Sequence, residues 1–163
     1  MKKYIYILSL FVLTLSSCKK DEVVGGTAVE EMSGDWWVKF ERVDDKGVVE
    51  LPFGNYYPLS TYNTSDNSPS LMWLDDQNAY YGLKAKVNVD YSGKTFVATD
   101  AEELYYGVTV TIKNGKVIKN GAVGAVSKAV TDSIAFDAVY SDSPGKTYRY
   151  RGYHRTKFSG DDH

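Results

Sequence analysis

The sequence has one cysteine among 163 residues, two histidines and no surplus of basic residues. A single cysteine excludes an intramolecular disulfide framework and a cysteine-rich zinc site. Nineteen Lys and Arg against 21 Asp and Glu give a formal charge of −2, which excludes the basic footprint of a nucleic-acid-binding protein. The length suffices for one domain with a real hydrophobic core. We expect neither a cofactor nor a nucleic-acid partner.

The longest apolar run lies at the start. Lys2 and Lys3 precede the segment 4–15, which is apolar except for Ser9 and Thr14. A segment this short is typical of a signal peptide and not of a transmembrane helix. The tetrapeptide at 15–18, Leu-Ser-Ser-Cys, resembles the bacterial lipobox. The resemblance implies that residues 1–17 are a cleaved lipoprotein signal and that Cys18 carries acyl chains. An ordinary secretory signal is the alternative.

Cleavage before Cys18 would determine the domain boundaries and the cellular location of the protein. Residues 18–31 would be the lipidated cysteine and a flexible tether, and residues 32–160 the folded domain. Two or more acyl chains hold a protein stably on a membrane, so the membrane is a partner through Cys18. The charged run at 19–22 resembles the surface-export tags of some Gram-negative lipoproteins. We expect the protein to lie in the cell envelope, anchored to the outer membrane by lipid. It would face either the cell surface or the periplasm.

The mature chain shows the period-2 alternation of β-strands, and no window has a convincing helical period. Trp36, Val38 and Phe40 share one face, opposite Lys39 and Glu41. The same pattern recurs at 83–90, 108–112 and 134–138. One buried and one wet face favour antiparallel strands. With the runs at 56–62 and 71–74, the pattern predicts eight to ten short strands, which form a small barrel or a sandwich.

Glycine-containing turns separate the expected strands. Asn114-Gly115 predicts a tight hairpin that joins 108–113 to 116–119, because both positions of such a turn favour positive φ. Asn120-Gly121 predicts a further turn, and residues 121–131 are expected to form a connecting loop.

Gly34-Asp35-Trp36 is similar to the Gly-x-Trp that begins the first strand of lipocalins and related calycins. In those barrels an arginine of the last strand covers the tryptophan and closes one end. Arg149, Arg151 and Arg155 are the candidates for such a structural end-cap on Trp36. The expected fold is all-β: a single small antiparallel β-barrel, lipocalin/calycin-like.

Longer stretches carry a family resemblance; they are 34–38, 61–65, 72–76, 84–90, 110–121 and 152–158. In order and spacing they resemble the lipid-binding putative hydrolase family of small lipoproteins from Gram-negative gut commensals. The resemblance covers nearly all the mature chain. It implies a lipocalin-like barrel and a small apolar ligand, and it supplies no catalytic motif to carry over.

Catalysis finds little support in the residues. No Gly-x-Ser-x-Gly elbow occurs, and lipidation would consume Cys18. His154 is the sole plausible base, because His163 ends the sequence and is expected to be mobile. Ser133 lies beside Asp132, but no spacing requires a triad. Enzyme activity stays open, with the balance against it.

Metal binding has little support either. Asp75-Asp76, with Asp66 and Asn67, could supply oxygens for Ca²⁺, but adjacent strand residues point to opposite faces. We interpret the four as solvated loop residues and expect no metal site. Asp132-Ser133-Ile134 resembles a short O-glycosylation acceptor of Gram-negative exported proteins, which makes Ser133 a candidate for modification.

Aromatic residues supply the candidate ligand site, because tyrosine offers a flat apolar face and a hydroxyl. The predicted ligand-binding residues are Tyr62, Trp73, Tyr80, Tyr81, Tyr105, Tyr148, Tyr150 and His154. The first functional hypothesis is an anchored lipoprotein that binds a small hydrophobic or lipid-like ligand in its barrel. An interior filled by side chains is the competing interpretation. The alternatives are a structural or interaction lipoprotein that serves a surface nutrient-uptake system and, third, a weak lipid or ester hydrolase.

Overall fold

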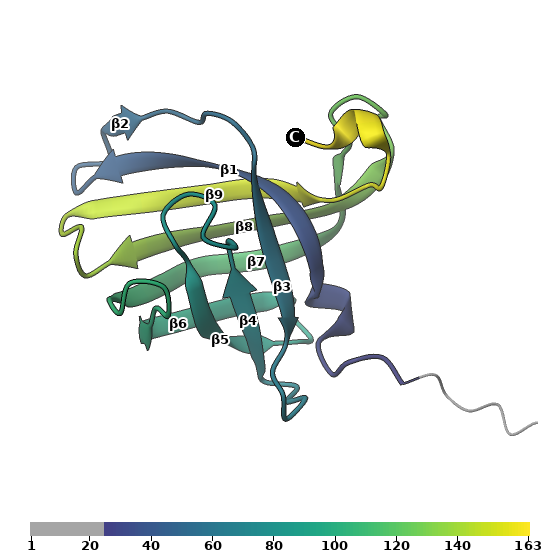
Figure 1. Ribbon diagram of the computed structural model, residues 1–163, viewed down its shortest axis with the longest axis horizontal. Helices are drawn as coiled ribbons and strands as arrows, with labels where there is room; N and C mark the ends of the chain where they lie inside the picture. Colours follow the sequence, from purple (N-terminus) through teal and green to yellow (C-terminus); the bar gives the residue numbers. More distant parts are fainter. Residues whose placement is uncertain (1–24) are drawn as a thin grey trace, which may run out of the picture.

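A computed structural model describes residues 25–163 as a barrel of antiparallel strands with two short 3₁₀ turns (Figure 1). The predicted signal peptide and Cys18 lie outside these residues. The elements are η1 (Glu30–Met32), β1 (Gly34–Asp44), β2 (Val49–Leu51), β3 (Tyr57–Asn63), β4 (Leu71–Asp75), β5 (Lys84–Asp90), β6 (Thr95–Glu102), β7 (Thr109–Val123), β8 (Val130–Tyr140), β9 (Lys146–His154) and η2 (Ser159–Asp161).

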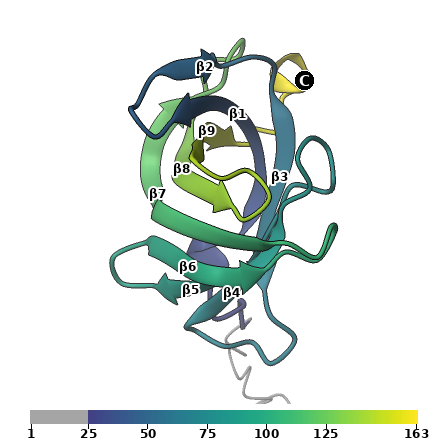
Figure 2. The same cartoon turned by 90° about the vertical axis from the view of Figure 1, so that its left-hand side faces the viewer.

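The sheet closes because β1 pairs on both sides. Its first half pairs with β3, where Trp36 lies opposite Leu59, and it pairs along nearly its whole length with β9. Each remaining strand pairs with the next along the chain, so β1 and β3–β9 form a closed ring of eight strands, and β2 extends the sheet beside the end of β1. Figure 2 looks into this ring. The predicted all-β antiparallel barrel is confirmed.

Aromatic rings fill the barrel along its axis. Trp36, Val38 and Phe40 point inward and are at most 4% exposed, as their alternation predicts. Phe136 stacks on Tyr150, with ring centroids 4.5 Å apart and planes 9° apart, and Tyr150 lies 5.6 Å from Phe40. An eight-stranded barrel is just wide enough for such side chains or one small ligand. Here side chains occupy the axis.

Two predicted turns are bulges inside one long strand. β7 continues through Asn114-Gly115 and Asn120-Gly121, and both asparagines have left-handed φ, 55° and 54°. Between Lys113 and Lys116 the strand has one residue more than β8 opposite, which defines a β-bulge. The positive φ that favours a tight turn also serves a bulge, so the dipeptide alone cannot distinguish them. The loop expected at 121–131 therefore shrinks to 124–129.

Both ends of the folded domain extend further than the sequence suggests. Val29 and Met32 are fully buried against the barrel, so residues 29–31 belong to the domain and not to the tether. At the other end, the expectation that His163 is mobile is wrong. Its ring stacks on Tyr56 at 4.1 Å, and its Nε2 lies 2.7 Å from the Tyr153 hydroxyl.

A buried carboxylate fastens the C-terminal turn to the β7–β8 loop. Asp161 is 1% exposed, and its carboxylate accepts hydrogen bonds from the backbone N–H groups of Val126 and Ser127 at 2.7 and 2.9 Å. The hydroxyls of Ser127 and Thr156 donate to the same carboxylate. These hydrogen bonds, with that of Ser127 the strongest, hold the pKa of Asp161 far below its usual range.

Replacing Phe136 with alanine should lower the free energy of unfolding by about 3–5 kcal/mol, because the cavity would open in a filled core. Urea unfolding followed by tryptophan fluorescence measures the loss. Val126→Ala, at a side chain 66% exposed, is the control and should stay within about 0.5 kcal/mol of the parent. Similar small losses in both variants would contradict a filled interior.

The Asp161 fastening predicts a specific pH dependence. Its pKa is lowered by folding, so its stabilisation is present above the unfolded-state value of about 3.9 and is lost as pH falls toward the folded-state value. Asp161→Asn should therefore lower Tm at pH 7, and the difference from the parent should shrink steadily below about pH 4. Asp45→Asn, on the exposed β1–β2 turn, is the control. A Tm difference that stays constant down to pH 2 would show that the carboxylate charge is not involved.

Candidate functional site

The predicted ligand-binding residues do not form one site. They separate into four places, each fixed by strand parity or by a loop. Tyr148 and Tyr150 lie in the core, Tyr80 and Tyr81 at one end of the barrel, His154 at the other end, and Tyr62, Trp73 and Tyr105 on the outer wall.

Tyr148 and Tyr150 are core residues that do not line an open mouth. They are 2% and 3% exposed, and the Tyr150 hydroxyl pairs with that of Tyr140 at 3.2 Å. Burial raises the pKa of Tyr150 far above its usual value. The Tyr150 phenol is therefore a neutral packing group at neutral pH.

The β1–β2, β4–β5 and β8–β9 loops lie at the same end of the barrel (Figure 1). This end has an opening lined by aromatic residues, here called the mouth. Tyr80 is 45% exposed, and its ring lies 4.3 Å from Phe40 and 4.9 Å from Tyr57. A pocket of about 200 Å³ opens here, lined by Phe40, Leu51, Pro52, Gly54, Asn55, Tyr57 and Tyr80. The apolar interior reaches solvent at this point.

Tyr81 connects the mouth to the core. Its ring contacts those of Tyr140 and Tyr148 at 4.4 and 4.7 Å, and its hydroxyl donates to Asp142 at 3.4 Å. Burial, with the neighbouring Tyr148 hydroxyl, raises the pKa of Tyr81 to about 12. The rim thus presents a neutral phenol and a carboxylate beside an apolar floor.

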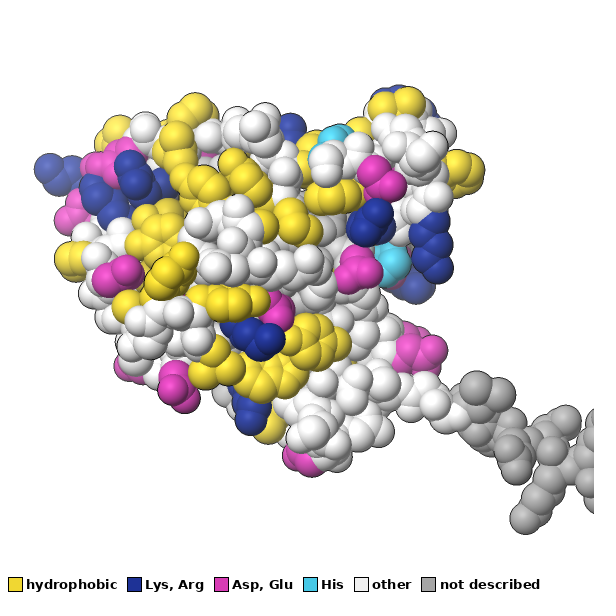
Figure 3. Space-filling model, viewed as in Figure 1, with side chains coloured by type: hydrophobic (Ala, Val, Ile, Leu, Met, Phe, Trp, Pro, Cys, Tyr) yellow, Lys and Arg dark blue, Asp and Glu magenta, His cyan; other side chains and the backbone are white. Residues whose placement is uncertain are grey.

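Tyr62, Trp73 and Tyr105 lie outside the barrel. Met72 and Leu74 point inward and are fully buried, so Trp73 between them points outward. The rings of Tyr62 and Trp73 lie side by side across β3 and β4, with centroids 6.4 Å apart. Figure 3 shows hydrophobic side chains gathered around a basic one over this wall.

Asp75 holds this wall together from beneath. It is 6% exposed and accepts hydrogen bonds from the hydroxyls of Tyr62 and Tyr105 at 2.8 and 2.7 Å, and it pairs with Lys84 at 2.9 Å. Burial raises the pKa of Asp75, but Lys84 and the two hydroxyls outweigh it, so the pKa ends below its usual value. The neighbouring Asp76 is 3% exposed. The interpretation of Asp75 and Asp76 as solvated loop residues is therefore wrong.

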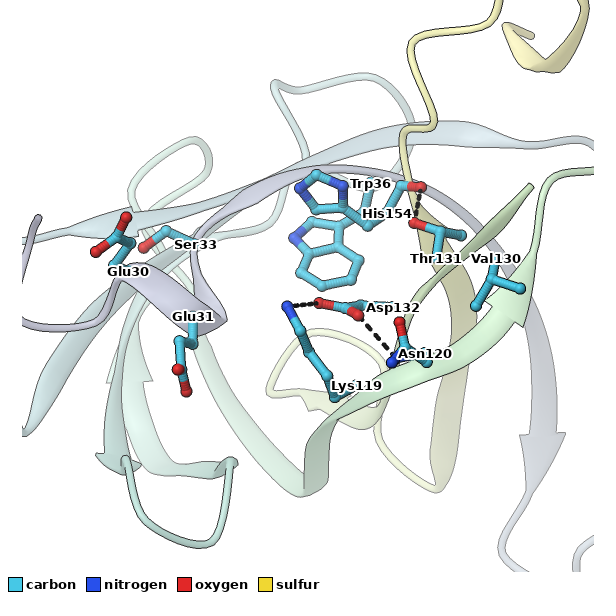
Figure 4. Close-up of a pocket in the computed structure, with 10 residues that line it drawn as sticks. All are labelled: Glu30, Glu31, Ser33, Trp36, Lys119, Asn120, Val130, Thr131, Asp132 and His154. Carbon is cyan, nitrogen blue, oxygen red and sulfur yellow. Dashed lines mark hydrogen bonds and ion pairs between the residues drawn. The ribbon is translucent and has the colours of Figure 1, made fainter.

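The opposite end of the barrel has a hollow of about 600 Å³, here called the polar cleft (Figure 4). It is lined by Glu30, Glu31, Ser33, Trp36, Lys119, Asn120, Val130, Thr131, Asp132 and His154. The second bulge of β7 brings Asn120 here, where its backbone N–H donates to Asp132 at 2.8 Å, and Lys119 pairs with the same carboxylate at 3.2 Å. The sequence did not predict Lys119 and Asn120 as site residues, because the dipeptide at 120–121 predicts a turn and not a strand that lines a cleft.

Trp36 and His154 form the aromatic edge of the polar cleft. Their rings meet edge to face at 5.0 Å. A Cβ on Gly34 would lie 2.2 Å from the His154 Nε2, so this position needs glycine to leave room for the ring. The partner of Trp36 is thus a histidine, where the resemblance to lipocalins implied an arginine.

The three candidate arginines lie elsewhere. Arg155 covers the ring of Trp37, the neighbour of Trp36, at 5.0 Å. Arg149 and Arg151 project outward and pair with Glu41 and Asp137 at 3.2 and 3.1 Å. The prediction of an arginine end-cap on Trp36 is therefore wrong. All three arginines point to the outer face of the barrel, whereas Trp36 points inward.

The described residues show no activated nucleophile at His154. The hydroxyl of Thr131 donates to the backbone oxygen of His154 and not to its ring. Ser133 and Asp132 are adjacent on β8 and point to opposite faces, so they form no dyad; Ser133 lies on the outer face against Gly121. The Tyr153 hydroxyl pairs with the imidazole of the exposed His163, but Tyr153 itself is 4% exposed, and burial raises its pKa, which disfavours a phenolate nucleophile.

Residues 25–163 contain no group of three or more His, Cys, Asp or Glu side chains placed to hold a metal ion. The same part of the chain contains no helix with the length and apolar character needed to cross a membrane.

A second apolar hollow lies on the outside, over β1 and β9, and is here called the β9 groove. It measures about 440 Å³ and is lined by Lys39, Phe53, Tyr56, Ala122, Val123, Arg151, Gly152 and Tyr153. Phe53 is 44% exposed, and Lys39 lies 4.3 Å above the Tyr56 ring. The sequence pattern did not reveal it, because its lining comes from four separate segments.

Comparison with known proteins places the chain in a family. No curated protein matches the sequence. A solved structure from Bacteroides ovatus, a structural genomics target of unknown function, is 13% identical with a TM-score of 0.49; the match covers 76% of this chain and 42% of that one. Residues 21–159 match the family described as lipid-binding putative hydrolase. This chain therefore belongs to the lipid-binding putative hydrolase family.

Proposed function

We propose that this protein is a membrane-anchored lipoprotein that binds a small hydrophobic or lipid-like ligand at the mouth of its barrel. The observation that carries the proposal is the pocket over Phe40, where a half-exposed Tyr80 covers the point at which the apolar interior meets solvent. Membership of a lipid-binding family supports the ligand class.

The mouth suits an apolar ligand better than the interior does. The Phe136–Tyr150–Phe40 rings occupy the barrel axis, so a ligand would lie above Phe40 and not beneath it. Ligand sites are typically concave and mostly apolar, with a few polar groups that fix orientation. Leu51, Tyr57 and Tyr80 supply the apolar walls. The Tyr81 hydroxyl and the Asp142 carboxylate stand nearby to meet a polar head.

Anchoring is the second part of the proposal, and it rests on the sequence of the first 18 residues. Removal of residues 1–17 takes away two lysines and no acidic residue, so the formal charge falls from −2 to −4. A chain of that charge has little electrostatic attraction to an anionic bilayer. Acyl chains on Cys18 would supply the attachment that the folded domain lacks.

Tyr80→Ala should weaken binding of a neutral fluorescent apolar probe, N-phenyl-1-naphthylamine, by about tenfold, because an aromatic contact of roughly 1.4 kcal/mol would be lost. Phe53→Ala is the matched control: its ring is equally exposed, 44% against 45%, but lies in the β9 groove. Binding should be unchanged there. Loss in Phe53→Ala alone would place the ligand in the β9 groove and contradict the mouth.

Cys18→Ala should leave the barrel folded and release the protein from the membrane fraction, because the mutation removes the acyl chains and no disulfide. Fractionation and a salt wash measure the release. Uncleaved precursor could stay bound through its apolar segment, so the mature size must be checked on the same gel. Mature-sized Cys18→Ala that stays in the membrane after the wash would contradict lipid anchoring.

A further inference from the structure

We propose that the outer wall around Trp73 is a second binding site, for a neutral carbohydrate. The site is a groove of about 310 Å³, here called the Trp73 groove, lined by Trp73, Lys86, Ala101, Glu102 and Leu104. It lies on the side of the barrel and shares no lining residue with the mouth. The proposal is independent of the proposed function.

A β-bulge builds one side of the groove. Between Ala98 and Ala101, β6 has one residue more than β7 opposite, and Asp100 at this point has a left-handed φ of 46°. Regular alternation from the buried Ala98 would point Glu102 into the core. The extra residue reverses the alternation, so Ala101 lies opposite the buried Val110 and Glu102 is exposed. Bulges re-aim side chains in this way beside functional sites.

Two buried carboxylates hold both sides of the groove in place. Asp75 fixes the hydroxyls of Tyr62 and Tyr105 and the ammonium of Lys84, which surround Trp73. Glu103 is fully buried, and its carboxylate accepts the backbone N–H groups of Lys84 and Tyr105 at 3.2 and 2.7 Å.

That second carboxylate fastens the loop that carries Leu104, which is 46% exposed. Fixed supports beneath a partly exposed aromatic surface are typical of a pre-organised binding site. A surface that only has to be soluble requires no such support.

The charges in the groove select the ligand class. Among the residues that line the groove, Lys86 contributes one positive charge and Glu102 one negative charge, so the lining has a formal charge of zero. A fatty acid or a phosphate would require a positive surplus. A sugar ring instead has apolar C–H faces and a rim of hydroxyls that both donate and accept hydrogen bonds.

Each part of a sugar ring has a counterpart in the groove. Trp73 and Leu104 provide apolar surfaces, the Lys86 ammonium donates hydrogen bonds and the Glu102 carboxylate accepts them. The Lys86 ammonium lies over the Trp73 ring, 5.1 Å from its centroid, so a hydrogen-bond donor is present at the aromatic face itself. The arrangement therefore fits a neutral polyhydroxylated ligand.

The test is binding of residues 25–163, biotinylated and tetramerised on streptavidin, to an array of neutral and acidic glycans. The protein should bind neutral glycans, and Trp73→Ala should reduce the signal at least tenfold. Glu102→Gln should reduce it less, because the amide oxygen still accepts a hydrogen bond. Phe158→Ala is the control and should bind like the parent, because Phe158 is an exposed aromatic residue at the start of η2 that does not line the groove. Urea unfolding of each variant verifies its fold, and Leu104→Ser replaces Trp73→Ala if the latter is unfolded.

Absence of binding to any neutral glycan, or binding to acidic glycans alone, would overturn the proposal. An equal loss in Phe158→Ala would do the same, because binding would then not depend on the groove. The apolar-probe assay at the mouth separates this result from the proposed function. Trp73→Ala should bind N-phenyl-1-naphthylamine like the parent, and Tyr80→Ala should bind glycans like the parent.

Discussion

An eight-stranded barrel leaves room inside for little more than its own side chains, and in this protein aromatic rings take that room. The contacts from Phe136 through Tyr150 to Phe40 run along the axis and fill it. This filling displaces every candidate site from the interior. A ligand must be bound at the mouth, at the polar cleft or on the outer wall. The chemistry of each place is set by the loops and outward-facing side chains around the packed core.

Bulges give the regular sheet its irregular, chemically useful positions. The left-handed residues Asp100 and Asn120 each interrupt the alternation of a strand. The first exposes Glu102 beside Trp73, and the second brings Lys119 and Asn120 to Asp132 in the polar cleft. In both cases a small polar residue that tolerates positive φ lets one strand redirect the side chains that follow it.

Buried carboxylates fasten the loops of the barrel, a role that disulfides or metal ions fill in other small domains. Asp75, Asp76, Glu103 and Asp161 are each at most 6% exposed, and each accepts a hydrogen bond from a backbone N–H group of a loop. Loop backbone that cannot join the sheet thereby finds hydrogen-bond partners. The same contacts position Tyr62 and Tyr105 on the outer wall and fasten the C-terminal turn.

The sequence by itself determined the fold class, the family and the inward face of most strands, because alternation of apolar and polar residues is a local signal that a one-sided sheet must obey. It determined the inward position of Trp36, Val38 and Phe40 correctly. Only the tertiary structure decided whether Asn114-Gly115 forms a turn or a bulge, because the same positive φ serves both and the partner strand selects between them. Only the tertiary structure separated the tyrosines into core, mouth and wall, since exposure of a ring depends on strand register and on loops that meet only after the barrel closes.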